Sequence, residues 1–287
     1  MKQYKQHFLD KLAEESLDLS TTEKTLADYI TNNYKKISFL DLSDVSKILS
    51  LDTDLINSYC NKLGFKDYEE LRKSIRDLAM SELSSTDRFE FSQINMNSKI
   101  ASVKNTVITK ELSNLNKLME SFDESLFYTM LEEIINAPEI IVVATRSSAI
   151  IADYIEHMFN KIGKRTTKIT SGASSNFDNF AMFDKNALVL AIGFARYPKE
   201  TIRVLSFFKK HSFKVISITD NTLSALAPFS DLVFPIPCES VSITDFYATP
   251  ISLINMMIIL LSQIDKEGSL SYLNKFEEIA KEYGFYF

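Results

Sequence analysis

Two short segments combine arginine with hydroxyl groups, and such a combination suits a small anion. Each segment follows an apolar run and precedes a helical pattern. The residues are Arg146, Ser147 and Ser148 in the first segment, and Arg196, Tyr197 and Thr201 in the second. A guanidinium, hydroxyls and the free N–H groups of a helix start together favour phosphate. The first segment alone is better explained by a serine N-cap beside a solvated arginine. Both segments together predict an anion-binding site.

Catalytic groups near these segments are few. A sugar isomerase needs a positioned base with a pKa near neutrality, and Glu200 and Glu239 are the candidates. Glu200 stands at an expected helix start, where a carboxylate has the ordinary role of stabilising the helix dipole. We interpret His157, on another expected helix, as a partly buried structural residue. The sequence therefore predicts no catalytic residues and no enzyme activity.

The cysteine and histidine content predicts neither a metal nor a cofactor. Cys60 and Cys238 are far apart and form no CxxC pair, and the chain holds three histidines. No spacing of these residues is typical of a structural zinc site. We expect both thiols to be reduced and buried or half-buried.

The elements around the arginine segments predict a parallel sheet covered by helices. From residue 139 onward, short β-branched runs alternate with helical segments. We expect strands at 140–144, 166–169, 187–192, 214–219 and 232–235, and helices at 148–162, 199–211, 223–227 and 246–264. This is a doubly wound α/β domain with five parallel strands. Such domains bind ligands at the carboxyl ends of their strands, where both arginine segments fall.

Residues 1–83 predict a compact all-α domain without proline. Ser20 and Glu23 fit a capping box at the start of one helix. A second helix is expected at 42–49, and a third begins after Asp52 or Thr53 and stops at Gly64. This order is that of a helix-turn-helix, whose second helix enters the major groove of DNA. Two helices of any small bundle are the alternative interpretation.

The third helix supplies the candidate DNA contacts. They are Thr53, Asn57, Ser58 and Asn61 toward the groove, and Lys62 and Lys66 toward phosphates. Residues 1–83 nevertheless contain twelve Lys and Arg against fifteen Asp and Glu. Phosphate contacts need cations, so a dimerisation or protein-docking module is the alternative to DNA binding.

Both halves resemble the RpiR family of bacterial transcription regulators. Residues 59–71, YCNKLGFKDYEEL, are similar to the segment that closes the family's helix-turn-helix, and residues 19–30 to its opening helix. Ser50 replaces the usual turn glycine. Residues 120–265 resemble the sugar isomerase (SIS) domain, in the branch with an Arg-Ser-Ser first loop and a Phe-x-Arg-Tyr-x-x-Glu-Thr second loop. The resemblance implies a helix-turn-helix domain at 1–83 and an SIS-like ligand-binding and oligomerisation domain at 111–287. The polar stretch that opens 84–110 is expected to be a linker leading into a connecting helix.

This resemblance implies a regulator that binds operator DNA as a homodimer or homotetramer and responds to a small phosphorylated sugar or related anion. Many SIS domains hold phosphate with a Ser-x-Ser-Gly-x-Thr loop. Here Gly193, Ala195, Arg196 and Pro198 occupy those positions, so the serines of the first segment and the two arginines must supply the contacts. An SIS-type sugar-phosphate isomerase with an accessory helical domain, or a sensor acting on a protein partner, are the alternatives.

Composition predicts a globular cytoplasmic protein without membrane contact. Hydrophobic residues make up 45% of the chain, charged residues 24%, and the net charge is −6. The first residues are charged and show no signal-peptide pattern. The longest apolar run, 251–261, is interrupted by Ser252 and Asn255 and is shorter than the roughly 18 residues of a span. The helix expected at 246–264 is apolar on all faces. We expect it at a subunit interface, with complete burial in one subunit as the alternative.

Overall fold

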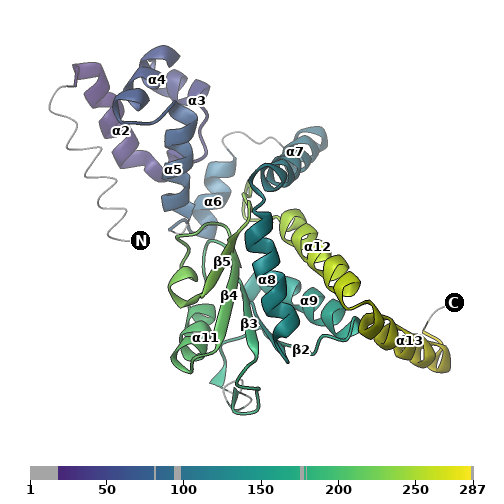
Figure 1. The fold of residues 1–287 in the computed structure, drawn as a ribbon. Helices are drawn as coiled ribbons and strands as arrows, with labels where there is room; N and C mark the ends of the chain where they lie inside the picture. The colour runs from purple at the N-terminus through teal and green to yellow at the C-terminus, as the bar shows by residue number, and fades with distance from the viewer. Residues whose placement is uncertain (1–18, 81, 94–97, 175–177, 179, 286–287) are drawn as a thin grey trace. The chain divides into compact units, whose positions relative to one another are not determined.

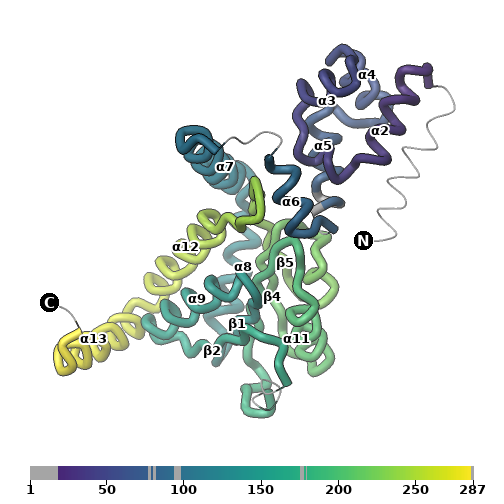
Figure 2. The backbone as a smooth tube through the Cα atoms, turned by 180° about the vertical axis from the view of Figure 1, so that it is seen from behind, coloured from purple at the N-terminus to yellow at the C-terminus, as the bar shows by residue number. Residues whose placement is uncertain are grey.

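The computed structural model describes residues 19–80, 82–93, 98–174, 178 and 180–285. The chain divides into two compact units, traced in Figures 1 and 2. The first consists of residues 1–106 with 241–243, and the second of residues 107–240 and 244–287. The charged residues 1–18, on which the expectation about the signal peptide rests, lie outside the described residues.

The first unit is helical, as predicted. Its helices are α2 (Thr21–Ile37), α3 (Leu42–Leu49), α4 (Thr53–Lys62), α5 (Tyr68–Met80) and α6 (Ser85–Ser92). The predicted capping box is present, because the Ser20 backbone N–H donates to Glu23 at 2.9 Å and the Glu23 N–H donates to the Ser20 hydroxyl at 3.3 Å. Apolar faces of α2, α3, α4 and α5 form one core around Leu26, Ile30 and Tyr59.

Part of the segment expected to be a linker is helical. Ser84 caps α6, and its hydroxyl accepts from the Asp87 N–H at 3.0 Å. Arg88 and Ser92 on this helix are buried. The polar residues that suggested a linker include a Ser-x-x-Asp capping box, which starts a helix. The long helix α7 (Ile100–Ser121) then leads the chain into the second unit.

The second unit is a doubly wound α/β domain. Its elements are α8 (Glu124–Asn136), β1 (Ile140–Val143), a 3-10 turn (Arg146–Ser148), α9 (Ala149–Lys161), β2 (Thr166–Ile169), β3 (Leu188–Ile192), α11 (Lys199–Lys210), β4 (Lys214–Thr219), β5 (Leu232–Pro235), α12 (Ala248–Ile264) and α13 (Lys266–Tyr283). All five predicted strands are present, each within one residue of its expected bounds. They pair in parallel in the order β2-β1-β3-β4-β5.

Helices cover both faces of this sheet (Figure 1). Alternate strand residues point to opposite faces. Val142 and Leu190 therefore pack with α8, α9 and α12, whereas Ile141 and Val189 pack with α11. Burial on both faces explains why these strands are continuous apolar runs.

Two expected helices differ in the structure. Residues 223–227 form no α-helix, and a 3-10 turn at Ala227–Phe229 follows instead. The Asn221 side chain accepts from the Leu223 N–H at 2.9 Å, an Asx turn that competes with helix, and Pro228 lacks a helical N–H. In α12 one face is buried, but Asn255 and Ile259 are exposed, so complete burial in one subunit is wrong.

The structure contains a C-terminal helix, α13, that the sequence analysis did not predict. It bends by 105° from α12. Among the described residues no single helix has the length and apolar character needed to cross a membrane. These two helices meet that criterion only as a bent pair, by length and composition.

Candidate ligand and nucleic-acid sites

The two arginine segments follow neighbouring strands, as predicted. β1 and β3 pair side by side, with Val143 opposite Ala191. The order of the sheet reverses here, because β2 lies beyond β1 and β4 beyond β3. Loops that leave a parallel sheet at such a point form the usual ligand crevice.

The loop after β1 has an uncommon backbone. Arg146 is exposed and adopts φ +60°, a left-handed conformation that costs a non-glycine residue about 1–2 kcal/mol. Ser148 occupies the N-cap position of α9, but neither helix start in this loop has a side-chain cap hydrogen bond. The serine hydroxyls are therefore not used as caps, and Ser147 is exposed beside the buried Ser148.

The serine hydroxyls instead face Tyr247, the residue before α12. The Tyr247 hydroxyl interacts with the hydroxyls of Ser147 and Ser148, and it donates a hydrogen bond to Asp245 at 3.4 Å. Burial raises the pKa of the Tyr247 hydroxyl, which therefore remains protonated at neutral pH. Its ring lies 6.3 Å from that of Phe194, in the loop after β3. Tyr247 thus contacts both candidate loops.

An aspartate at the end of β4 organises the loop after β3. Tyr197 donates its hydroxyl to Asp220 at 2.5 Å, and the Ala195 N–H donates to the same carboxylate at 3.4 Å. Burial, followed by the charge of Asp220, raises the pKa of Tyr197. Tyr197 therefore helps to position the loop, and its predicted ligand contact stays a prediction. Arg196, next to it, is exposed.

Thr201 also has an internal partner. Its hydroxyl lies 2.8 Å from that of Thr145, and both side chains are 1% exposed. This bond joins the loop after β1 to the start of α11, and the ligand contact of Thr201 stays a prediction. Sequence spacing placed this residue on the right helix but could not give the direction of its side chain.

A third loop is tied to the same place by Glu200. Its carboxylate accepts from the Gly172 N–H at 3.1 Å. A Cβ on Gly172 would lie 2.6 Å from the Glu200 Cβ, so the approach requires glycine. Glu200 is thus a structural tie between the loop after β2 and α11, rather than a helix-dipole group alone.

The other residues considered for catalysis have structural positions. Both oxygens of Glu239 accept from lysines, Lys110 at 2.6 Å and Lys117 at 2.5 Å. His157 is exposed, so its interpretation as a partly buried residue is wrong. Burial raises the pKa of the Cys60 thiol to about 12, and in the described ranges no three potential ligand residues cluster to hold a metal.

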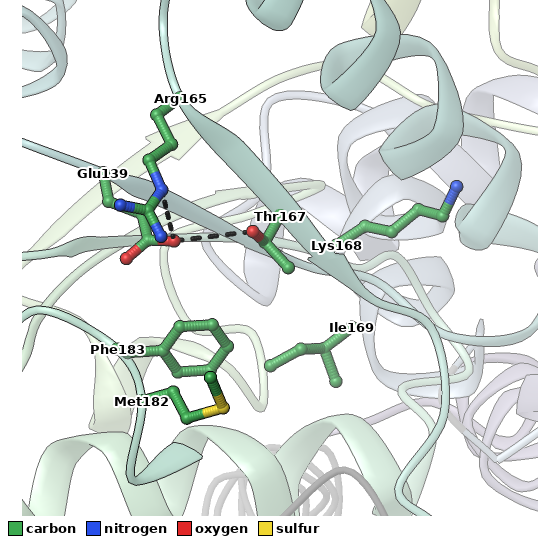
Figure 3. A pocket seen from close by; sticks show the side chains of 7 residues that line it. All are labelled: Glu139, Arg165, Thr167, Lys168, Ile169, Met182 and Phe183. Atoms are coloured by element: carbon green, nitrogen blue, oxygen red, sulfur yellow. Dashed lines mark hydrogen bonds and ion pairs between the residues drawn. The ribbon is translucent and has the colours of Figure 1, made fainter. Parts of the chain in front are cut away.

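A separate hollow of about 210 Å³ lies along the edge strand β2 (Figure 3). Its buried carboxylate, Glu139, precedes β1, at the opposite end of the sheet from the arginine loops. Figure 3 shows Glu139 with Arg165 and Thr167, whose nitrogen and hydroxyl lie 3.5 and 3.4 Å from it. Lys168 points away, toward Asp153 and Glu156. The contacts of Glu139 tie the strand ends together, and we take the arginine loops as the site.

The helix-turn-helix geometry lies in α3 and α4. Ser50, between the two helices, adopts φ +54°, so the position that the resemblance assigns to glycine does have a left-handed backbone. Asp52 caps α4 and accepts from the Asp54 N–H at 2.8 Å. One face of α4, with Ile56, Tyr59 and Cys60, is buried in the core.

The opposite face of α4 carries some of the predicted DNA contacts. Ser58 and Asn61 are exposed and stand three residues apart, on one side of the helix. Thr53 is half-buried at the helix start, and Lys66 is exposed beyond the helix end. These four remain predictions.

Two predicted DNA contacts have partners within the unit. The Asn57 side chain accepts from the Tyr68 N–H at 3.0 Å and so holds the start of α5. Lys62 pairs with the carboxylate of Glu23, a side chain that is 10% exposed. This pairing, with hydrogen bonds from Ser20, lowers the pKa of Glu23 to about 2. Asn57 and Lys62 therefore have structural partners that helix periodicity could not show, and their DNA contacts also stay predictions.

Sequence reasoning missed three residues of the ligand region. Tyr247 and Asp220 lie far along the chain from the loops that they contact, and Thr145 carries no motif of its own. Only the topology brings them together. The one local signal is that Asp220 directly follows a strand, since strand ends of such sheets meet at the ligand crevice.

Comparison with known proteins agrees with this architecture. The helix-turn-helix domain of the rpiR family matches residues 6–82, and the SIS domain matches residues 133–260. An uncharacterized HTH-type transcriptional regulator of Clostridium perfringens is 21% identical over 260 residues, which cover 90% of this chain and 92% of that protein.

Two solved structures share the fold. The sugar isomerase domain of an RpiR transcription factor from Sphaerobacter thermophilus has a TM-score of 0.57 and 24% identity, and the match covers 60% of this chain and 96% of that one. The Vibrio vulnificus NanR protein, complexed with ManNAc-6P, has a TM-score of 0.57 and 17% identity, and the match covers 96% and 98%.

A helix-turn-helix domain followed by a doubly wound domain of this type defines a two-domain transcription regulator. The two family domains occur here in that order. The chain thus combines a helix-turn-helix domain that matches the rpiR family with a domain that matches the SIS family.

Proposed function

We propose that this protein is a cytoplasmic transcription regulator that binds operator DNA through α3 and α4 and whose SIS domain binds a phosphorylated sugar or related small anion. The loops at 145–148 and 193–198 form the anion site. Arg146 and Arg196 supply positive charge, and Ser147 and Ser148 supply hydroxyls. The protein has no isomerase activity of its own.

The observation that carries the ligand proposal is the loop after β1. A strained arginine stands beside two serines whose hydroxyls are not used as helix caps. Backbone strain of this kind persists where the surroundings enforce it, and it is concentrated at ligand sites. Similarity in fold to NanR, whose structure holds ManNAc-6P, supports a sugar phosphate as the class of ligand.

A thermal-shift screen tests the ligand. The panel contains ManNAc-6P, other hexose and pentose phosphates, their unphosphorylated sugars, and inorganic phosphate. A ligand at one hundred times its Kd should stabilise the folded protein by about 2.7 kcal/mol. We expect stabilisation by a phosphorylated compound and none by its unphosphorylated sugar. Equal shifts from both members of a pair would contradict an anion site.

The DNA proposal rests on the geometry of α3 and α4 and on the family. The exposed side chains Ser58 and Asn61 suit base edges, and Lys66 suits a phosphate. Since Lys62 pairs with Glu23 inside the unit, each subunit presents few cations from this helix. Affinity should therefore depend on two subunits binding together.

A binding assay with the DNA upstream of the protein's own gene tests this. At low salt, Lys66→Ala should weaken all sequences alike and reduce the slope of log affinity against log salt by about 0.9 per subunit. Lys73→Ala, at an exposed position on α5, is the control for an equal change in net charge. No retention of any DNA by the wild-type protein, with or without phosphosugars, would favour the protein-docking alternative.

Oligomerisation is part of the proposal, as a homodimer or homotetramer. Large apolar side chains are exposed on both C-terminal helices, including Ile259 on α12 and Ile279 on α13. Exposed apolar side chains are candidates for a subunit interface where they lie together on the surface. Analytical ultracentrifugation should show a dimer or larger, and Ile259→Lys should shift it toward monomer.

Both candidate bases of the isomerase alternative have partners within the protein, which weighs against that alternative. Glu200 holds Gly172, and Glu239 binds two lysines. We expect no turnover of the phosphosugars in the panel by purified protein in a coupled isomerase assay. Reproducible turnover that is lost in Glu200→Gln would restore the enzyme interpretation.

A further inference from the structure

The loop between β5 and α12, residues 236–247, contacts both the candidate ligand loops and helix α7. Tyr247 stands at its end, where its hydroxyl interacts with those of Ser147 and Ser148 and its ring centroid lies 6.3 Å from that of Phe194. Glu239 stands near its start, and its carboxylate binds two lysines of α7. The anion site does not require the contacts between Glu239 and helix α7.

The attachment of α7 to this loop is unusually complete. Lys110, Asn114 and Lys117 are spaced so that they share one side of the helix, and all three bind Glu239. The Asn114 side chain donates to the Glu239 carbonyl at 2.9 Å and accepts from its N–H at 3.3 Å. Asn114 is fully buried, and Lys110 and Glu239 are 19% and 27% exposed. This is a specific anchor rather than a solvated surface pair, whose contribution would be small.

Helix α7 itself carries a carboxylate, Glu111, that reaches the other end of the loop. Glu111 accepts a hydrogen bond from the backbone of Ala248, the first residue of α12. Its other oxygen is buried without a partner among the described residues. Burial raises the pKa of Glu111. α7 therefore holds the loop at both ends, close to Glu239 and close to Tyr247.

The two ends of the loop are also joined directly. The Cys238 thiol donates to the Phe246 carbonyl at 3.0 Å. Cys238 precedes Glu239 in the chain, and Phe246 precedes Tyr247. Tyr247 and Glu239 are therefore connected through one hydrogen bond and two peptide bonds.

We propose that the loop at 236–247 couples occupancy of the anion site to helix α7, with Tyr247 as the residue that reports the ligand and Glu239 as the anchor that transmits its position. This rests on the proposed function, because it assumes that an anion binds at Arg146–Ser148. An anion that takes the serine hydroxyls competes with Tyr247 for them. The Tyr247 hydroxyl then shifts, and the loop passes the shift to the helix that leads the chain in from the first unit. Differential contacts of this kind are what allosteric coupling requires.

Amide hydrogen exchange on the full-length protein tests the coupling. The probes are inorganic phosphate and glucose 6-phosphate, each at saturation. In wild type we expect slower exchange at residues 145–149 and a change in α7 at residues 107–121. In Glu239→Gln, the change at 145–149 should persist, and the change in α7 should fall about 5-fold or more, the lower end of typical coupling factors.

Two further variants complete the experiment. Glu133→Gln is the matched control, because Glu133 also pairs with a lysine, Lys214, but lies on α8 away from the loop. It should respond as wild type does. Tyr247→Phe removes one hydroxyl at the other end of the loop, and it should also lose the change in α7. If Glu239→Gln folds poorly, Tyr247→Phe by itself tests the coupling.

The outcomes separate this proposal from the one on which it rests. Slower exchange at 145–149 without any change in α7 of wild type would overturn the coupling and leave the anion site intact. An undiminished α7 change in both Glu239→Gln and Tyr247→Phe would also overturn it. No effect of either probe at 145–149 in wild type would remove the anion site, and the coupling with it.

Discussion

The helix α4 and the loops at the strand ends both carry polar residues that were predicted to contact a ligand. They differ in which of these residues bind partners within the protein. In α4, Lys62 and Asn57 bind partners of their own unit, Glu23 and the backbone of Tyr68. In the strand-end loops, Tyr197 and Thr201 take the structural bonds, and both arginines are exposed. In both regions, residues that were predicted as contacts also hold the local structure.

The largest expected effect follows from the arginines of the loops. Arg146→Ala with Arg196→Ala should weaken phosphosugar binding about 100-fold or more, since each charge-assisted hydrogen bond contributes about 1.5–3 kcal/mol. Isothermal calorimetry measures the loss, and circular dichroism checks the fold. Arg203→Ala, exposed on α11, should retain wild-type affinity. Unchanged affinity in the double variant would place the anion elsewhere.

A smaller effect, on stability, is expected at Glu23. Glu23→Gln should lower the free energy of unfolding of the helical unit by about 1–3 kcal/mol at pH 7, because it loses charge-assisted bonds to Lys62 and Ser20. Urea denaturation measures this. Glu69→Gln, which removes a carboxylate 66% exposed that pairs with Arg72, should change stability by less than about 0.5 kcal/mol.

The pH dependence of the Glu23 effect has a defined sign. The folded state lowers the Glu23 pKa from 4.5 to about 2. The carboxylate therefore stabilises the fold fully above about pH 4.5, and this stabilisation is lost as the pH falls toward 2. The difference between wild type and Glu23→Gln should shrink over that interval. A difference that stays constant from pH 7 to pH 3 would contradict the pairing.

The two asparagines of α4 should separate structure from recognition. Asn57→Ala should destabilise the unit by about 1 kcal/mol, because the Tyr68 N–H loses its acceptor. Asn61→Ala, at an exposed position of the same helix, should change stability by less than about 0.5 kcal/mol and reduce discrimination between operator and random DNA. Thermal melts and competition binding give the two readouts. Equal melting temperatures for the two variants would show that the hydrogen bond from Tyr68 to Asn57 does not stabilise the unit.

The smallest effect is expected at Ser50. Its left-handed backbone costs serine more than glycine, and the greater freedom of glycine in the unfolded chain offsets part of the gain. Ser50→Gly should therefore stabilise the unit by about 0.5 kcal/mol. Ser43→Gly, within α3, should destabilise it by a similar amount. Melting temperatures that move in the same direction for both would contradict the turn geometry.

Most of the fold was predictable because it depends on local patterns. Short β-branched runs between helical segments predicted the five strands, and capping residues such as Ser20 and Asp52 predicted helix starts. The exceptions are also local. Ser84 belongs to a capping box that its polar surroundings concealed, and Pro228 with Asn221 prevents a helix that apolar spacing favoured.

The sequence by itself determined the two domains, the α/β order of the second, and the placement of two arginines after neighbouring strands. These features follow from backbone preferences and from the periodicity of apolar residues, which act over a few positions. The tertiary structure alone decided which side chains stay available. Tyr197 and Thr201 turn inward, Lys62 meets Glu23, and Tyr247 reaches loops far away in the chain. Such contacts depend on how distant elements pack, because a side chain's partner is set by position in space rather than by distance along the chain.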